Sequence, residues 1–198
     1  NTDISSLFEA TIRGGRMEIF TFDGNKDKVR GKGYGEAEII NYALNYSQII
    51  DKTSILIKIT GRLVIFNVMK LVVSRNLLCL NKSIQCAVNS DFSFADSRVL
   101  IAPVDFIKKF LVGCSQIDDS KGIFFEHILL KTIKEEHSFC YFPFILEPQI
   151  TGESGSTGEK YNKTNSSFRK WMFHMKYQLS LVVIHRKCSL KRMTILSR

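Results

Sequence analysis

Four short segments of the chain combine charged residues with glycines or aromatic residues, and the first suggests acid–base chemistry. Glu126 and His127 follow two phenylalanines in the sequence FFEHI, residues 124–128. A carboxylate among apolar neighbours is a common setting for a general base. Because adjacent residues of a helix point in different directions, only one of the two can face a cleft fully. We take Glu126 as the candidate catalytic residue, and the alternative is an exposed surface glutamate.

Two further segments place basic residues beside glycines, which suits an anionic ligand. The sequence KGYGE, residues 32–36, precedes a helical pattern, and the free N–H groups of a helix N-terminus favour phosphate. Its spacing fits neither a P-loop nor a dinucleotide fingerprint. The sequence KITGR, residues 58–62, ends an apolar strand, where open α/β sheets usually hold their ligands. We expect Lys58 and Arg62 to contact phosphate, and the alternative is a sheet-edge lysine and a solvated arginine.

The fourth segment, residues 90–98, carries Asp91, Asp96 and Arg98 between two expected strands. Its aspartates could ligate a metal ion or hold sugar hydroxyls, but aspartates also commonly cap turns, and both interpretations stay open. The sequence patterns of zinc deaminases, zinc proteases and serine hydrolases do not occur in the chain.

Alternating strands and helices must position these segments. Apolar alternation and β-branched runs predict strands at residues 17–22, 54–59, 84–88, 98–102 and 139–144. Helical spacing predicts helices at residues 36–46, 65–74, 104–112 and 122–135. Such an alternation favours the α/β class, with helices packed on both faces of a mostly parallel, Rossmann-like sheet.

The positive charge of the chain is confined to its C-terminal part. The formal net charge is +9, yet residues 160–198 hold ten basic residues and no acidic one, so the remainder is close to neutral. We therefore divide the chain into an α/β domain, residues 1–150, a Gly/Ser/Thr-rich linker, residues 151–166, and a basic amphipathic helix, residues 167–198. That helix either docks on the domain or lies on an anionic membrane surface.

Several classes of protein are disfavoured by composition. No apolar run is long enough to cross a bilayer, and the first residues lack the order of a signal peptide. Five cysteines without paired spacing argue against a disulfide framework. Nucleic acid is not an expected partner, because the body of the chain carries no basic surface. We expect a cytoplasmic protein, which is peripheral on the inner face of the membrane if its basic helix binds lipid and free if that helix docks on the domain.

The order of these segments resembles that of bacterial GT-A type glycosyltransferases of capsular or cell-surface polysaccharide synthesis, over roughly residues 1–146. Residues 1–3, NTD, are similar to the end of the second strand of that family, and residues 32–38 to its nucleotide-sugar loop and helix. Residues 57–62 fall where the family has its D-x-D strand end, and residues 96–103 resemble its acceptor-side strand. Glu126 falls where the family often has its acidic general base.

The resemblance implies transfer of a sugar from a nucleotide diphosphate sugar to a glycan or lipid-linked acceptor. It places Asp91, Asp96 and Arg98 at the acceptor and assigns the donor to Lys32, Gly33, Gly35, Glu36, Lys58, Thr60, Gly61 and Arg62. Because the paired aspartates are replaced, Lys58 and Arg62 would meet the diphosphate charge in place of Mg²⁺ or Mn²⁺, the candidate cofactors of the family. The first strand and helix of the family have no counterpart after residue 1. The alternative is therefore a truncated, non-catalytic relative that serves as a binding or membrane-associated module.

Overall fold

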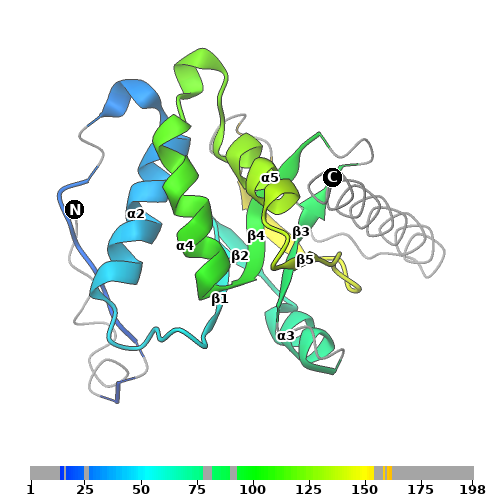
Figure 1. Ribbon diagram of the computed structural model, residues 1–198. Helices are drawn as coiled ribbons and strands as arrows, with labels where there is room; N and C mark the ends of the chain where they lie inside the picture. The colour runs from blue at the N-terminus through cyan, green and yellow to red at the C-terminus, as the bar shows by residue number, and fades with distance from the viewer. Residues whose placement is uncertain are drawn as a thin grey trace, which may run out of the picture.

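A four-stranded mixed sheet covered by helices forms the centre of the computed structural model, which describes residues 14–15, 17–24, 27–77, 82–89, 93–153, 158 and 160–161 (Figure 1). The strand order is β1-β4-β3-β5. The long strand β4 (Ala95–Pro103) pairs antiparallel with β1 (Ile55–Ile59) and with β3 (Ser83–Val88). The short strand β5 (Cys140–Tyr141) pairs parallel with β3.

The mostly parallel, Rossmann-like sheet predicted from the sequence is not found. Two of the three strand pairings are antiparallel. Only residues 89–94 join β3 to β4, and a parallel neighbour would need a crossover of roughly a dozen residues. The turn is closed by Asn89 N, which donates to Phe94 O at 3.0 Å. The α/β class is confirmed, and its sheet is mixed and mainly antiparallel.

Helices cover both faces of this sheet, as the sequence predicts. On one face α2 (Lys32–Tyr46), α4 (Val104–Gly113) and α5 (Phe125–Glu135) pack on the main core (Figure 1). On the other face α3 (Val68–Leu77) contributes to a smaller core. Leu100 and Ala102 belong to the first core, whereas Val99 and Ile101 belong to the second, as strand alternation requires.

Two expected boundaries at the start of the chain are wrong. The glycine-rich residues 33–35 form the first turn of α2 and do not precede it as a loop, and η2 (Lys28–Arg30), a short 3-10 helix, leads into it. Residues 17–22 form no strand, and the ring of Phe22 stacks on Tyr42 of α2 with centroids 4.4 Å apart.

A second expected helix start is also wrong. The helix predicted from residue 122 begins only at Phe125, because the Asp118 carboxylate caps a separate 3-10 turn, η4 (Asp119–Lys121), by accepting from Ser120 N. A further 3-10 turn, η3 (Cys114–Gln116), follows α4. The segment between α4 and α5 is therefore built of short turns.

A three-stranded antiparallel sheet stands beside the main one, in the order β2-β6-β7. Its strands are β2 (Leu63–Ile65), β6 (Ile150–Glu153) and β7 (Lys160–Tyr161). The predicted helix at residues 65–74 consequently starts at Val68, and parts of the predicted linker, residues 151–153 and 160–161, are strands. Ile65 and Ile150 bury their side chains against the smaller core, which stabilises this pairing.

Some expectations concern segments that the structure does not describe. The basic amphipathic helix at residues 167–198, the segment at residues 1–3 and Asp91 all lie outside the described residues. Within the described part of the chain, no helix combines the length and the apolar character that a bilayer-spanning segment needs.

Candidate functional site

A cleft of about 550 Å³ lies where the starts of α2, α5 and β4 meet the end of β1 and the second sheet. Its size falls within the roughly 300–1,000 Å³ that is usual for ligand pockets. The backbone N–H of Thr60 donates to Arg98 O at 3.2 Å, which holds the turn after β1 beside β4. Eight residues predicted from the sequence line this cleft: Lys32, Gly33, Glu36, Thr60, Arg62, Asp96, Arg98 and Glu126.

The remaining predicted residues lie elsewhere. Gly35 is inside α2 and Gly61 is in the exposed turn after β1, and neither belongs to the cleft wall formed by the described residues. Asp91 is outside the described residues. Lys58 lies behind the wall, where its ammonium contacts two residues that line the cleft, Thr60 and Ser97.

Lys58 is an internal cation whose charge is already paired. Its Nζ lies 2.7 Å from Glu36 Oε1 and donates to Thr60 Oγ1 at 3.0 Å and to Ser97 O at 2.5 Å. The ammonium also lies 5.2 Å from the centre of the Phe125 ring. The side chain is 11% exposed. Lys58 therefore holds α2, β1 and β4 together, and its position does not support direct contact with a diphosphate.

Glu126 stands in the first turn of α5 and faces the cleft. Ser97 Oγ donates to Glu126 Oε1 at 2.7 Å. The neighbouring His127 is used differently, because its Nδ1 accepts from the backbone N–H of Phe124 at 3.2 Å and so caps the helix. The two side chains therefore have different partners, although they are adjacent in the sequence.

Asp96 and Arg98 form a tight local ion pair at the rim. Arg98 Nε donates to Asp96 Oδ1 and Oδ2 at 2.9 and 2.8 Å, and the guanidinium lies 4.7 Å from the centre of the Tyr161 ring. The hydrogen bond with Asp96 is the main reason that the pKa of Arg98 is raised. The pair joins β4 to the second sheet through Tyr161.

The N-terminus of α2, where the sequence predicts an anion, already holds a carboxylate of the protein. Gly33 N donates to Asp119 Oδ2 at 3.2 Å. Gly31, at a φ of +92°, leaves room for this contact, because a Cβ there would lie 2.2 Å from Asp119 Oδ2. Asp119 Oδ1 is buried and accepts no hydrogen bond from the described residues. Such an oxygen calls for a donor from water or a ligand.

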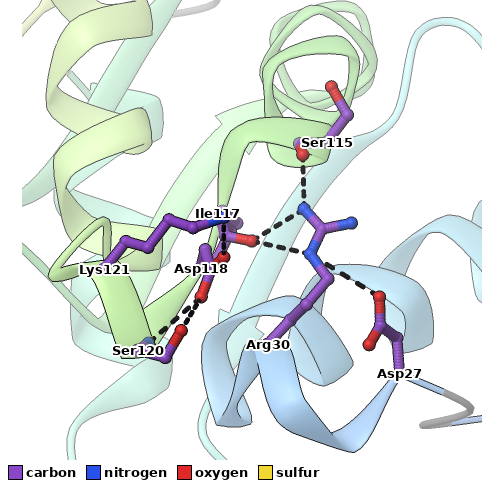
Figure 2. A network of polar contacts seen from close by, with 7 residues as sticks. All are labelled: Asp27, Arg30, Ser115, Ile117, Asp118, Ser120 and Lys121. Carbon is purple, nitrogen blue, oxygen red and sulfur yellow. Dashed lines mark hydrogen bonds and ion pairs between the residues drawn. The ribbon is translucent and has the colours of Figure 1, made fainter.

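Arg30 fixes the turn that carries Asp119 (Figure 2). Its Nε and Nη2 donate to Ile117 O at 3.0 and 2.7 Å, and Nη2 also donates to Ser115 O. Asp27 Oδ2 lies 4.0 Å from Arg30 Nε, and the ring of Tyr34 lies 3.8 Å below the guanidinium. Arg30 thereby ties the chain before α2 to the chain before α5.

Asp118 closes the same turn from its other side (Figure 2). Its carboxylate accepts from Ser120 N at 3.2 Å and lies 2.8 Å from Lys121 Nζ. The hydrogen bonds from Lys121 and Ser120 lower the pKa of Asp118 to about 2. Asp119 is consequently presented to the cleft by a turn that is pinned at several points.

The residues present do not form a metal-binding cage. Among the described residues, no three histidine, cysteine, aspartate or glutamate side chains come together as metal ligands. Two of the five carboxylates lining the cleft are paired, Glu36 with Lys58 and Asp96 with Arg98. The described side chains of the cleft therefore do not fit Mg²⁺ or Mn²⁺ as a resident ion.

Sequence reasoning missed four polar residues of this cleft: Ser97, Asp119, Glu153 and Tyr161. Ser97 lies between two residues that the sequence analysis selected, and its uncharged side chain gave no signal. Asp119 belongs to none of the four segments that the sequence analysis selected. Glu153 and Tyr161 belong to the segment taken for a linker, yet both line the cleft. Thr151 and Glu153 are two residues apart and are followed by glycines, which is the pattern of a strand that enters a turn. This was the sequence signal for the hairpin of β6 and β7.

The comparisons with known proteins add no relative: no family model matches the chain, and neither a curated protein nor a solved structure matches it significantly. The function is therefore argued from the cleft.

Proposed function

We propose that the chain is a glycosyltransferase that moves a sugar from a nucleotide diphosphate sugar to a hydroxyl group of a glycan or lipid-linked acceptor. The observation that carries the proposal is that Glu126 and Arg62 line one cleft of about 550 Å³. Sugar transfer to a hydroxyl needs a base for the acceptor proton and a positive charge for the leaving diphosphate. The proposal depends on this cleft, since the sheet departs from the parallel one that the GT-A resemblance implied.

Glu126 is the proposed base. Its carboxylate is half-buried, and Oε1 is held by Ser97, whereas Oε2 has no hydrogen-bond partner among the described residues. In this mechanism Oε2 takes the proton of the acceptor hydroxyl as the acceptor oxygen attacks the anomeric carbon. The bond from that carbon to the diphosphate oxygen breaks, and the electron pair leaves with the nucleoside diphosphate.

Arg62 is the proposed partner of the leaving group. It lies on the exposed turn after β1, lines the cleft and forms no ion pair with any described residue. A guanidinium binds phosphate oxygens through paired N–H donors, and it stays charged at any physiological pH. Lys32 lines the same wall and would add a second positive charge. These two residues replace the pair Lys58 and Arg62 suggested by the sequence.

The carboxylates of the cleft suit a sugar. Glu153 and Asp119 line it together with Glu126, and a carboxylate oxygen accepts hydrogen bonds from hydroxyl groups. The buried oxygen Asp119 Oδ1 lacks a donor among the described residues. Phe94, Phe124 and Tyr161 give the same cleft apolar walls. A ligand that combines hydroxyl groups with one anionic end matches this distribution of charge.

The test is turnover of a panel of UDP-, GDP- and dTDP-sugars by the full chain, with oligosaccharides or water as acceptor and released nucleoside diphosphate as the readout. Glu126→Gln should lower the rate by about 10²–10⁴-fold, the usual contribution of a general base. Its circular dichroism spectrum and melting temperature should stay those of the wild type.

Glu135→Gln is the matched control, because Glu135 is an exposed residue of the same helix. It should turn over like the wild type. An equal loss in both variants, or full activity in Glu126→Gln, would refute the role of Glu126. Nucleotide binding without turnover by the wild type would instead identify a non-catalytic relative.

A further inference from the structure

Ser97 links the proposed base to the internal cation of the cleft wall. Its side chain lies on β4 and is 4% exposed. The hydroxyl donates to Glu126 Oε1 at 2.7 Å, and the backbone carbonyl of the same residue accepts from Lys58 Nζ at 2.5 Å. One buried serine therefore contacts an acid from α5 and a base from β1.

The direction of this hydrogen bond follows from the chemistry of the two groups. An ionised carboxylate can only accept, so the hydrogen of the serine hydroxyl points at Glu126. Bonds of this kind, to a charged acceptor, are stronger than those between neutral groups. The backbone of Ser97 is fixed beside Glu126, because Lys58 holds its carbonyl and is in turn held by Glu36 and Thr60.

The result is a carboxylate with two unlike oxygens. Oε1 is occupied by Ser97, and Oε2 makes no hydrogen bond with the described residues. Fixing one oxygen sets the orientation of the other, and the rate of a proton transfer is sensitive to such orientation. The cleft thus presents one oxygen of Glu126 to an incoming hydroxyl.

We propose that Ser97 is a positioning residue for Glu126, and that Lys58 serves the reaction by holding Ser97 rather than by contacting the diphosphate. The inference rests on the proposed function, in which Glu126 accepts the proton. Ser97 touches neither substrate nor reacting atoms in this scheme. Charged groups from every element around the cleft face Glu126. The basic ones are Lys32 of α2, Lys58 of β1, Arg62 of the turn after β1 and Arg98 of β4. The acidic ones are Glu36 of α2, Asp96 of β4, Asp119 of η4 and Glu153 of β6.

The first test is the pH profile of turnover in Ser97→Ala. Loss of the hydrogen bond removes a group that favours the charged carboxylate, so the acid limb of the kcat profile should move to higher pH. On the plateau kcat should fall about tenfold, the cost of one hydrogen bond of about 1.4 kcal/mol, while KM for the donor stays the same. Ser97→Thr keeps the hydroxyl and should restore the position of the acid limb.

Ser74→Ala is the matched control, because the hydroxyl of Ser74 donates to a backbone carbonyl in α3, Leu71 O, at 2.8 Å and lies outside the cleft. Its pH profile should be that of the wild type. A tenfold loss in Ser97→Ala with an unmoved acid limb would show a merely structural serine and overturn the proposal.

A second measurement separates this inference from the proposed function. Melting temperatures of the wild type, Ser97→Ala, Glu126→Ala and the double variant form a cycle that needs no activity, and alanine at either position removes the hydrogen bond. If the two residues are coupled, the double variant loses clearly less than the sum of the single losses. If the losses are coupled but the wild type turns over no nucleotide sugar, the hydrogen bond between Ser97 and Glu126 is supported and the proposed glycosyltransferase activity is refuted. Strictly additive losses would refute the role of Ser97 whatever the turnover.

Discussion

The ammonium of Lys58 lies 2.7 Å from the carboxylate of Glu36, and the two side chains are 11% and 28% exposed. The pair joins the strand β1 to the helix α2 at the wall of the cleft. Because both groups are largely removed from water, each needs the other to offset the cost of its desolvation. The pair is therefore part of the scaffold of the site.

Lys58→Met leaves Glu36 without its partner and should lower the free energy of unfolding by about 1–3 kcal/mol, the cost of an unsatisfied group in a largely buried setting. Urea unfolding of Lys58→Met and of the wild type measures this loss of unfolding free energy. The double variant with Glu36→Gln should recover part of the loss. Lys109→Met removes the more exposed pair with Glu136, whose side chains are 45% and 30% exposed, and should cost less than about 1 kcal/mol. Equal losses in the two lysine variants would contradict this account.

Gly31→Ala should destabilise the start of α2, since it adds a clash with Asp119 to an unfavourable φ of +92°. The expected loss is about 2–3 kcal/mol in urea unfolding. Gly122 also has a positive φ, +72°, but a Cβ there meets no atom within 4 Å, so Gly122→Ala reports the backbone strain alone, about 1 kcal/mol. If the two variants lost the same stability, Asp119 would not lie against Gly31.

The lowered pKa of Asp118 makes the free energy of unfolding depend on pH in the acid range. Its pKa falls from the ordinary value of 3.8 to about 2 through Lys121 and Ser120. A lowered pKa means that the carboxylate contributes stability above pH 3.8 and loses it as the pH falls toward 2. Asp118→Asn should therefore unfold at lower urea than the wild type at pH 6, and the two midpoints should converge between about pH 4 and pH 2. A gap of constant size over that range would disprove the role of this carboxylate.

The sequence predicted the elements whose signals are local. The helical spacing at residues 104–112 correctly predicted α4, which begins at Val104. The apolar runs of β1, β3 and β4 were found within a few residues of their bounds. Strand direction was not predictable in this way, because a strand buried on both faces has the same apolar run in a parallel or an antiparallel sheet. The short connection at residues 89–94 decided it, and of the charged residues of the fourth selected segment it holds only Asp91, whereas Asp96 and Arg98 belong to β4.

The site was predictable in its location but not in its pairings. Segments that follow a strand or begin a helix converge at the cleft, so Glu36, Arg62, Asp96 and Glu126 were selected correctly as neighbours. Lys58 was misjudged, because its partners Glu36 and Ser97 are far away in the sequence. Tyr161 was missed because a segment rich in Gly, Ser and Thr looks like a linker until β2 is known to pair with β6.

The most direct measurement of the central claim is the melting temperature of the full chain with each member of a panel of nucleoside diphosphates and nucleotide sugars. A ligand that binds the native state must raise the melting temperature. We predict that the melting temperature rises with nucleotides of one base and rises less in Arg62→Ala. In Lys70→Ala, a control on the exposed side of α3, the rise should equal that of the wild type. No rise with any nucleotide, or the same rise in Arg62→Ala as in the wild type, would contradict a nucleotide-sugar site in this cleft.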